Sequence, residues 1–449
     1  MKNWDRIRCA SCNAMLMGRR LFVASLLLVC FWWVGCGCNE KSGVSGADGA
    51  VDDASIRDSQ PDAMRDSRPD AEDQHSNDGG LVDGQWPPEP VTYDFCDEPF
   101  FKLPIDGLTE TSHRVQVWGS GVVYAKEPAG GNRRSSLYYL DLETCKEYQL
   151  TIEEERAGGA WLYEKRVVYR ACHDFCSKDP PKGSDLFLID LDDWSKSRVL
   201  EEDIGIIETK FNGRHVVLME YQPGDWEPNL PPTRQVVWDM ATEEKVALTP
   251  WGAGTPYYAI SERYVVWSGY FGLEGQVGKD VAYYDLQTGE MVHIESTLPW
   301  HQTGVDVWED NIVWVARENY SSPPYHTKLF NVESGVETTI TENEEKHSYA
   351  TIHKNIVAYS TSLLRDPSLQ GNWPADLVLY EIGSGKTRRL TTESGKLNQV
   401  RIFEPYFLTV HVLGSHPNMN DYYIANLRKL GVTDEEGNLL EGEPVITPP

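Results

Sequence analysis

One pattern recurs along most of this chain and constrains its fold more than any other feature. In each copy an apolar run ends in an acidic or amide residue that an aliphatic residue follows, and we call the acidic or amide position the marker. The markers are Asp141, Asp190, Asp239, Asp285, Asn331, Glu381 and Asn426. These seven markers have a mean period of 47.5 residues.

A second apolar element precedes each marker. It is a pair of β-branched or other apolar residues, followed in the clearest copies by an aromatic one. The pairs are Val122-Val123, Val167-Val168, Val216-Val217, Val265-Val266, Ile312-Val313, Ile356-Val357 and Phe407-Leu408. Further short strands are expected before the pair, at 114–118, 304–308 and 399–403, and after the marker, at 147–151, 245–249, 337–341 and 388–392.

Four short strands in a period of this length are typical of propeller blades. The sequence therefore predicts an all-β protein, a seven-bladed β-propeller of four-stranded antiparallel blades over residues 95–449. Residues 101–104 precede the first β-branched pair at nearly the spacing of the fourth strands in later copies. We expect this N-terminal strand to complete the last blade, and residues 444–447 are the alternative fourth strand.

The clearest copies continue the marker as Asp-Leu-x-Thr-Gly, and their last strand ends in Leu-Thr, as in residues 284–290 and 384–392. This unit resembles the TolB-like propeller repeats of periplasmic and surface proteins, over roughly residues 100–449 and at repeat level. The Ser-Pro-Asp-Gly turn of that family is absent from the sequence, and TolB itself has six blades and an N-terminal α/β domain. The resemblance implies a non-enzymatic binding scaffold of the cell envelope.

Residues 1–35 have the features of a signal peptide. Arg19 and Arg20 precede an apolar run over 21–34. As a helix this run is too short to cross a hydrocarbon core of about 30 Å, so a signal peptide is favoured over a membrane anchor.

The apolar run ends in Gly35-Cys36, which resembles the lipobox of bacterial lipoproteins. The resemblance implies that Cys36 receives a lipid. Cys38, which also follows a glycine, is the second candidate, and ordinary cleavage without a lipid is the alternative. We expect an exported protein that is lipid-anchored in the bacterial cell envelope, at the outer membrane or cell surface rather than the inner membrane.

Residues 36–94 are predicted to form a disordered tether. From 39 to 89 the chain carries 13 acidic and 4 basic side chains and almost no large apolar ones. Such a segment cannot bury enough apolar surface to offset the entropy of ordering it. The whole chain has a formal net charge of −28, which repels phosphate backbones, so we do not expect nucleic-acid binding.

Four cysteines remain in the mature domain: Cys96, Cys145, Cys172 and Cys176. In an exported protein an even number of cysteines indicates possible disulfides, and four allow three pairings. A local bridge between Cys172 and Cys176 would leave Cys96 to pair with Cys145. A metal site at the Cys-x-x-x-Cys spacing is the alternative.

Long, irregular connections follow the second strand of each blade, whereas the connections after the first and third strands are short. In antiparallel blades the long connections share one face, and this face is our candidate binding surface. Its aromatic residues are Trp226, Trp251, Tyr270, Phe271, Trp300, Tyr320, Tyr325 and Trp373. Aromatic side chains beside polar groups suit a glycan or a protein partner, and packing onto their own loops is the alternative.

The sequence contains no Gly-x-Ser-x-Gly, His-Glu-x-x-His or Walker-type motif. We therefore expect no catalytic residue, metal or cofactor, and we predict that the protein is not an enzyme. In the alternative interpretation His301, His326 and His416 bind a divalent metal in a carbohydrate lyase or hydrolase. The markers are interpreted as turn residues whose side chains accept backbone hydrogen bonds.

Overall fold

The fold is described from a computed structural model. It covers residue 86 and residues 89–105, 115–126, 135–152, 157–172, 183–202, 205–222, 232–255, 257–271, 279–294, 301–317, 325–341, 346–362, 376–391, 397–412 and 420–446. All of them belong to the compact unit Asn77–Pro449. The predicted signal peptide, Cys36, Cys38 and most of the predicted tether lie outside the described residues.

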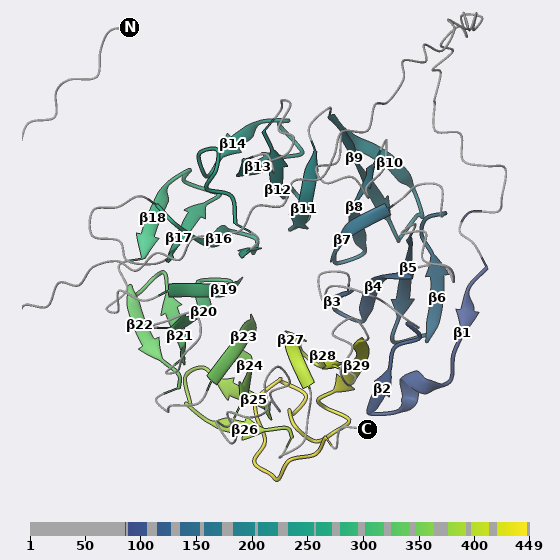
Figure 1. Cartoon of the computed structure of the whole chain (residues 1–449). Coiled ribbons are helices and arrows are strands. Elements are labelled where there is room, and N and C mark those ends of the chain that lie inside the picture. The colour runs from purple at the N-terminus through teal and green to yellow at the C-terminus, as the bar shows by residue number, and fades with distance from the viewer. Residues whose placement is uncertain are drawn as a thin grey trace, which may run out of the picture. The chain divides into compact units, whose positions relative to one another are not determined.

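Seven antiparallel sheets are arranged as blades around an axis, which confirms the predicted seven-bladed β-propeller (Figure 1). Blade 1 consists of β3 (Val115–Trp118), β4 (Gly121–Lys126), β5 (Ser136–Asp141) and β6 (Lys146–Gln149), with β1 (Val91–Thr92) added outside β6. Blade 2 consists of β7 (Ala157–Tyr163), β8 (Arg166–Cys172), β9 (Ser184–Asp190) and β10 (Lys196–Glu202). Blade 3 consists of β11 (Ile206–Phe211), β12 (His215–Tyr221), β13 (Thr233–Asp239) and β14 (Lys245–Ala247).

The remaining blades repeat this order, with the first strand of each blade innermost (Figure 1). Blade 4 consists of β15 (Tyr258–Ile260), β16 (Tyr264–Gly269), β17 (Asp280–Asp285) and β18 (Met291–Ile294). Blade 5 consists of β19 (His301–Trp308), β20 (Asn311–Arg317), β21 (Tyr325–Asn331) and β22 (Val336–Thr339). Blade 6 consists of β23 (Lys346–His353), β24 (Ile356–Ser362), β25 (Asp376–Glu381) and β26 (Thr387–Arg389). Blade 7 consists of β27 (Leu397–Phe403), β28 (Tyr406–Val412), β29 (Asn420–Asn426) and β2 (Phe100–Lys102).

The core is divided into seven apolar clusters, one between each pair of neighbouring blades. The β-branched pairs explain this division, because successive side chains of a strand point to opposite faces of its sheet. Val265 packs toward blade 3 with Tyr258 and Trp267. Its neighbour Val266 packs toward blade 5 with Ile312 and Trp314. Each pair therefore supplies one side chain to each of the two blade interfaces.

The markers lie where the third strand of each blade ends, and most of them act as turn residues. Asp141 Oδ1 accepts a hydrogen bond from the backbone N–H of Glu143 at 3.0 Å, and Asp239 Oδ1 accepts one from Ala241 at 2.9 Å. Asn331 Oδ1 does the same for the N–H of Ser334 at 2.9 Å. Such bonds order the tight turn and explain why Asp and Asn alternate at this position.

The threonine that ends the Leu-Thr motif has a repeated role. In blade 1 Thr151 Oγ1 accepts a hydrogen bond from the backbone N–H of Leu137 at 2.8 Å. The same bond joins Gln235 to Thr249, Thr327 to Thr341 and Leu377 to Thr391. It holds the end of the fourth strand against the start of the third.

The ring is closed by the N-terminal strand. β2 pairs antiparallel with β29, as expected from the spacing, and Leu103 donates its N–H to Tyr422 O at 2.8 Å. The alternative strand at 444–447 does not complete blade 7, because the N–H groups of Val445 and Ile446 donate to Leu390 O beside blade 6.

The structured chain begins earlier than the predicted boundary at residue 95. β1 pairs with β6, and Trp86 donates its Nε1–H to Trp194 O and packs edge-on against that ring. The prediction placed these residues in the tether because the segment before them is acidic and has almost no large apolar side chains. A disulfide between Cys96 and Cys145 links the 3₁₀ helix η1 (Phe95–Asp97) to blade 1. Throughout the described ranges no helix has the length and apolar character needed to span a bilayer.

Candidate functional site

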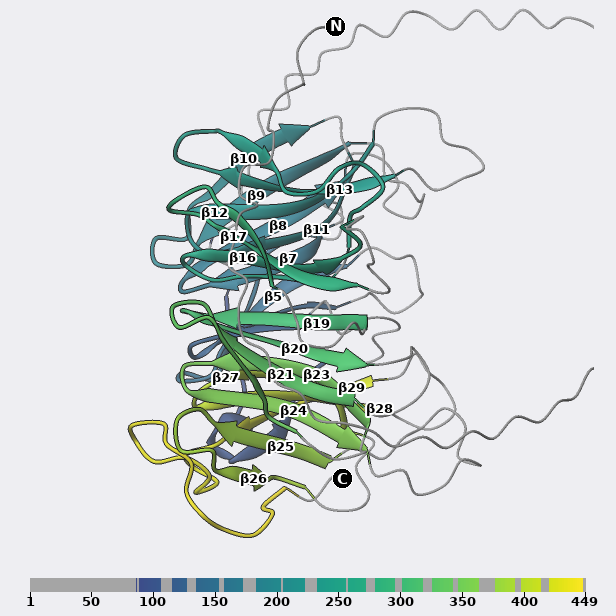
Figure 2. The ribbon, with the colours of Figure 1, turned by 90° about the vertical axis from the view of Figure 1, so that its left-hand side faces the viewer.

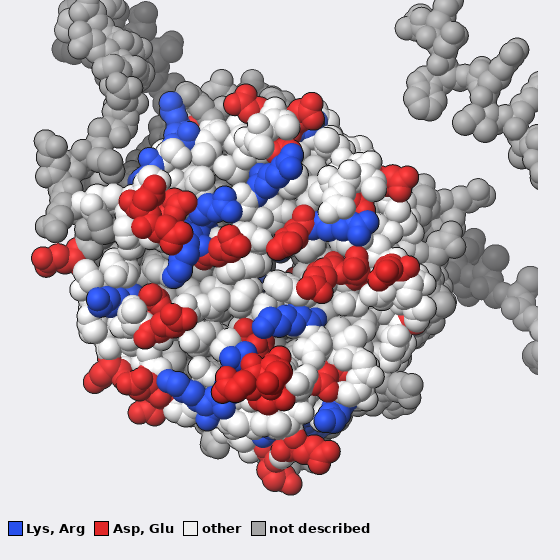
Figure 3. All heavy atoms as spheres, turned by 180° about the vertical axis from the view of Figure 1, so that it is seen from behind, with Lys and Arg blue, Asp and Glu red and all other residues white. Residues whose placement is uncertain are grey.

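The propeller has two different faces (Figure 2). The turns between the first and second strands, and between the third and fourth strands, share one face, which we call the turn face. The opposite face, the loop face, carries the connections after the second strand and between blades. All turns of the turn face belong to the described residues, whereas most loop-face connections do not. Figure 3 shows the turn face, on which acidic and basic side chains are interspersed.

Aromatic side chains meet at the axis near the turn face. They are the last residues of six of the seven innermost strands, Trp118, Tyr163, Phe211, Trp308, His353 and Phe403, and we call them the axial aromatic cluster. The ring centroid of Trp118 lies 4.3 Å from that of Tyr163, 4.5 Å from that of Phe403 and 5.9 Å from that of Trp308. Because Trp118 and Trp308 belong to blades 1 and 5, these contacts cross the ring centre.

His353 belongs to this cluster as a buried, neutral ring. Its centroid lies 3.9 Å from that of Phe403, and its Nδ1 accepts the backbone N–H of Glu404 at 3.0 Å. Burial and the neighbouring ammonium of Lys354 lower the pKa of His353 to about 3. This histidine therefore serves in packing at neutral pH.

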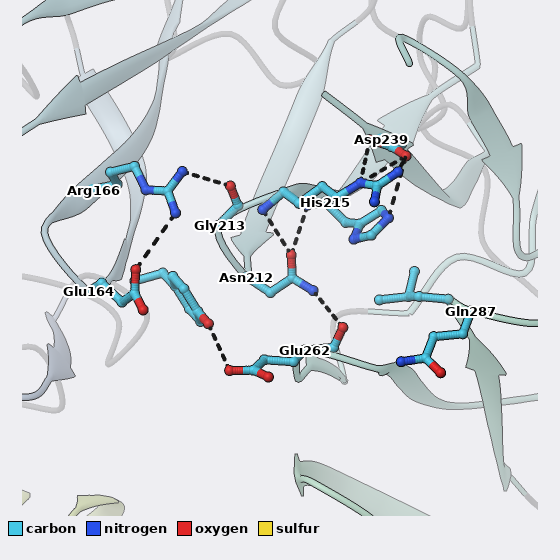
Figure 4. A pocket seen from close by; sticks show the side chains of 11 residues that line it. Glu164, Arg166, Asn212, Gly213, His215, Asp239, Glu262 and Gln287 are labelled. Atoms are coloured by element: carbon cyan, nitrogen blue, oxygen red, sulfur yellow. Dashed lines mark hydrogen bonds and ion pairs between the residues drawn. The ribbon is translucent and has the colours of Figure 1, made fainter. Parts of the chain in front are cut away.

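A polar pocket of about 700 Å³ opens beside this cluster on the turn face, across blades 2, 3 and 4 (Figure 4). It is lined by Tyr163, Glu164, Arg166, Asn212, Gly213, Arg214, His215, Asp239, Glu262, Leu286 and Gln287. All of these except Gly213 and Leu286 carry polar side chains. We call it the turn-face pocket.

The polar groups of the pocket are held by one another. Arg214 and Asp239 form a bidentate pair, with Nε 3.1 Å from Oδ1 and Nη2 2.5 Å from Oδ2. Arg166 donates from Nη1 to Gly213 O at 3.0 Å (Figure 4). Asn212 donates from Nδ2 to the backbone oxygen of Ser261 at 2.7 Å and is within 3.5 Å of that of Glu262. The site is therefore rigid before any ligand binds.

Gly213 is required at its position in this turn. Its φ of +92° favours glycine, and a Cβ there would lie 2.9 Å from the ring of Tyr163 and 2.9 Å from Arg166 Nη2. The close approach of this backbone to Arg166 is what allows the carbonyl oxygen of Gly213 to accept its hydrogen bond.

The charges of the pocket nearly balance, with two guanidinium groups against three carboxylates. The hydrogen bonds from Arg214 hold the pKa of Asp239 well below its usual range. Burial lowers the pKa of His215, whose Nε2 lies 3.7 Å from Asp239 Oδ2, so this imidazole is neutral at neutral pH. Burial raises the pKa of Tyr163 to about 12, and its hydroxyl donates to Glu262 Oε1 at 3.2 Å.

The aromatic residues predicted for the binding face have different outcomes in the structure. Trp226, Trp300, Tyr320 and Trp373 lie outside the described residues. Tyr325 is only 1 % exposed and packs in the cluster between blades 5 and 6, so its assignment to a binding surface was wrong.

The other three described aromatics differ from one another in exposure. Phe271 packs against Trp267 and the ring of His293, so it covers the domain's own core. Trp251 is half-buried, with the guanidinium carbon of Arg234 4.2 Å from its ring centroid. Tyr270 is 54 % exposed.

The histidines of the alternative interpretation lie partly within the structure. His301 and His326 are on β19 and β21, with β20 between them, and His326 Nδ1 lies 2.9 Å from Thr341 O. His416, Cys176 and the side chain of Cys172 are outside the described part of the chain. Among the residues that the structure describes, no group of three His, Cys, Asp or Glu side chains could hold a metal ion.

No family model matches this sequence, and no curated protein does either. Solved structures match the fold. An oligogalacturonate lyase from Vibrio parahaemolyticus has a TM-score of 0.52 at 13 % identity, covering 78 % of this chain and 99 % of that one. The β-propeller domain of the Trilobed protease from Pyrococcus furiosus has a TM-score of 0.51 at 12 % identity, covering 70 % of this chain and 94 % of that one.

Two further structures are matched over a smaller share of their own length. The acylaminoacyl peptidase of Pyrococcus horikoshii has a TM-score of 0.50 at 13 % identity, and this chain spans 50 % of its length. TolB from Acinetobacter baumannii has a TM-score of 0.39 at 13 % identity, covering 62 % of this chain and 64 % of that one. The similarities with TM-scores of 0.50 or more establish the β-propeller fold, and the predicted TolB-like resemblance is supported at the level of that fold.

These findings correct the prediction that the protein is not an enzyme. That prediction was drawn from a family resemblance and from missing motifs. The solved structures that share the fold include a lyase and peptidases. A propeller of this kind is therefore no ground for a non-enzymatic assignment, because function resides in sites and not in the fold.

The sequence interpretation missed both the axial aromatic cluster and the turn-face pocket. A signal for the first was present, because an aromatic residue stands three to five positions before six of the seven β-branched pairs. No comparable signal exists for the pocket, since Tyr163, Asn212 and Glu262 come together only through the packing of three consecutive blades.

Proposed function

We propose that the propeller binds a neutral carbohydrate in the turn-face pocket. The observation that carries the proposal is the set of prearranged polar side chains that three blades bring to one concave site. Amide, guanidinium and carboxylate groups can both donate to and accept from sugar hydroxyls. Groups already fixed by their neighbours lose little entropy when a ligand binds.

Size and charge support this ligand class. The volume of about 700 Å³ lies within the usual range of small-ligand sites, about 300–1,000 Å³. Two guanidinium groups against three carboxylates favour a neutral ligand over a strongly charged one. A protein partner would instead need a broader surface of about 800 Å² with apolar anchors.

The test is binding of neutral oligosaccharides on a glycan array, followed by calorimetric titration of the positive glycans. Arg214→Gln should weaken binding at least tenfold, because it removes a donor and frees Asp239. Arg263→Gln is the matched control, since Arg263 pairs with Asp285 Oδ2 at 2.9 Å on the next blade and does not line the pocket.

Two outcomes contradict the proposal: wild-type protein that binds no neutral glycan, and an Arg263→Gln variant that loses as much affinity as Arg214→Gln. Bound glycans are also analysed by mass spectrometry for hydrolysis or elimination products. Such products would assign the pocket to catalysis and not to binding alone.

One observation favours a second carbohydrate surface on the loop face. Tyr257 and Tyr270 are 37 % and 54 % exposed, and Lys279 Nζ lies 5.1 and 5.9 Å from their ring centroids. Exposed tyrosine faces beside an ammonium suit the stacking of sugar rings. A Tyr257→Ala, Tyr270→Ala double variant in the same array measures this contribution, and unchanged binding leaves the turn-face pocket as the site.

We further propose that the protein is exported and lipid-anchored through Cys36. Its support is the sequence itself, in which Gly35-Cys36 ends the apolar run. Cys36→Ser should move the protein from the membrane to the soluble fraction, while Cys38→Ser, the matched control, stays with the membrane. The reverse result would assign the lipid to Cys38, and release of neither variant would contradict the anchor.

A further inference from the structure

A second group of polar side chains lies at the axis, beyond the axial aromatic cluster as seen from the turn face. It consists of Trp161, Lys210, Asp306 and Arg401, which come from blades 2, 3, 5 and 7, and we call it the axial charge cluster. Each of these residues stands one or two positions before the last residue of its innermost strand. The innermost strands run toward the turn face, so this cluster lies on the loop-face side of the aromatic rings.

Two cations converge on one indole. Lys210 Nζ lies 5.1 Å from the ring centroid of Trp161, and the guanidinium carbon of Arg401 lies 5.5 Å from the same centroid. Burial lowers the pKa of Lys210 to about 8, with a further contribution from Arg401, while Glu208 and Asp306 act in the opposite direction. The protein thus holds a buried ammonium and a half-buried guanidinium close together.

The donors of these cations are mostly unused. Within the described part of the chain, Arg401 makes its ring contact with Trp161 but no hydrogen bond or ion pair. Lys210 donates one hydrogen bond, to Tyr258 O, and its ammonium has three donors. Lys210 is buried, and an unused donor in a buried place costs free energy unless an acceptor is supplied. Arg401 is half-buried, so its guanidinium keeps donors that a ligand at the axis can reach.

The acid of the cluster does not supply this acceptor. Asp306 Oδ1 accepts the N–H of Val307 at 3.0 Å, and Oδ2 accepts that of Ile352 at 3.1 Å, which joins blade 5 to blade 6. Each carboxylate oxygen thus accepts one backbone hydrogen bond. Asp306 acts on the two cations as a nearby opposite charge, without a hydrogen bond to either of them in the described part of the chain. Donors of Arg401 and Lys210 therefore remain for a ligand.

We propose that the axial charge cluster binds the carboxylate group of a small ligand, with Arg401 as bidentate donor and Lys210 as the second donor. The planar fork of a guanidinium matches the two oxygens of a carboxylate. Trp161, Asp306 and Arg401 are half-buried, so the site keeps surface that a small ligand can reach. This site is separate from the turn-face pocket, and each can be tested without the other.

The experiment titrates the full protein calorimetrically with acetate, succinate and citrate, and with inorganic phosphate as a comparison, at low ionic strength and pH 7. Wild type should bind at least one of the carboxylates saturably. Arg401→Gln should lose at least tenfold in affinity, and Arg401→Lys should recover only part of it. Arg263→Gln should match wild type. Because Arg401 has no hydrogen-bond partner in the described structure, its variants should keep the wild-type melting temperature.

A second readout separates ligand binding from a structural role. Carboxylate affinity should fall as the pH rises from 7 to 10, because Lys210 then loses its proton, and this dependence should disappear in Lys210→Gln. The proposal is overturned if no carboxylate binds, if Arg401→Gln binds as wild type does, or if only phosphate binds.

Discussion

The turn-face pocket and the axial charge cluster lie on opposite sides of the axial aromatic cluster, and they satisfy their charges in different ways. In the pocket Arg214 is paired with Asp239 of its own blade, and its side chain is 59 % exposed. In the axial cluster Lys210 is 7 % exposed, and the charged groups that act on it, Arg401, Glu208 and Asp306, belong partly to other blades.

This difference indicates two routes to a polar site in a propeller. In any blade the turn after the first strand lies beside the turn after the third strand. A local pair such as Arg214 and Asp239 therefore forms within one blade and does not depend on the other blades. The axial groups meet only when blades 2, 3, 5 and 7 are all in place. Burying incompletely paired charges costs stability, which makes the second site the more demanding one to build.

The largest effect is expected from a substitution in the axial aromatic cluster, which lies between the two sites. Trp118→Ala deletes an indole that contacts Tyr163, Trp308 and Phe403, and it should lower the free energy of unfolding by about 3 kcal/mol or more. Urea unfolding followed by circular dichroism measures this change. Tyr270→Ala, which removes an exposed ring, is the control and should stay within about 0.5 kcal/mol of wild type. Equal changes in the free energy of unfolding for the two variants would show that the axial aromatic cluster does not stabilise the propeller.

A smaller effect is expected in the pH dependence of stability, because of the buried ammonium of Lys210. The pKa of Lys210 is about 8 in the fold and about 10.4 in an unfolded chain, so the unfolded state binds more protons between these values. Stability should therefore rise with pH from 8 to 10 in wild type relative to Lys210→Met, by at most about 1.4 kcal/mol per pH unit. Urea titrations at pH 7, 8, 9 and 10 provide the comparison. Parallel curves for the two proteins would mean that Lys210 is not desolvated.

The smallest effect is expected in the pocket and in a different pH range. Arg214 lowers the pKa of Asp239, so the pair stabilises the fold above the unfolded pKa of about 3.9 and loses this contribution as the pH falls further. Because the partner guanidinium is exposed, Asp239→Asn should cost less than about 1 kcal/mol at pH 7. In thermal unfolding the gap between variant and wild type should narrow progressively as the pH falls below about 3.9. A gap that does not narrow in this range would assign the cost to packing.

Much of the fold could be predicted because its signals are local. The markers order turns two or three residues away, as Asp141 does for Glu143, and the β-branched pairs serve the two faces of one strand. Even ring closure followed from a spacing, since the N-terminal strand takes the place that a fourth strand holds in every other blade.

The candidate site could not be predicted in the same way. Long aromatic loops drew attention to the loop face, yet Tyr325 is part of the core and Phe271 covers it. A tyrosine at the edge of a loop and a tyrosine at the start of a strand look alike in sequence, because burial depends on the neighbouring blade. The pocket residues Arg214 and Gln287 stand in short, ordinary turns and gave no signal.

The sequence by itself determined the number of blades, the order of strands within each blade and the strand that closes the ring. Each of these follows from pairing between segments that are neighbours along the chain or that repeat at a constant period. Only the tertiary structure decided which side chains share the axis, where Trp118 of blade 1 meets Trp308 of blade 5 and Arg401 of blade 7 reaches Trp161 of blade 2. A linear repeat carries no information about contacts across a closed ring, because those contacts depend on the number and tilt of all the blades together.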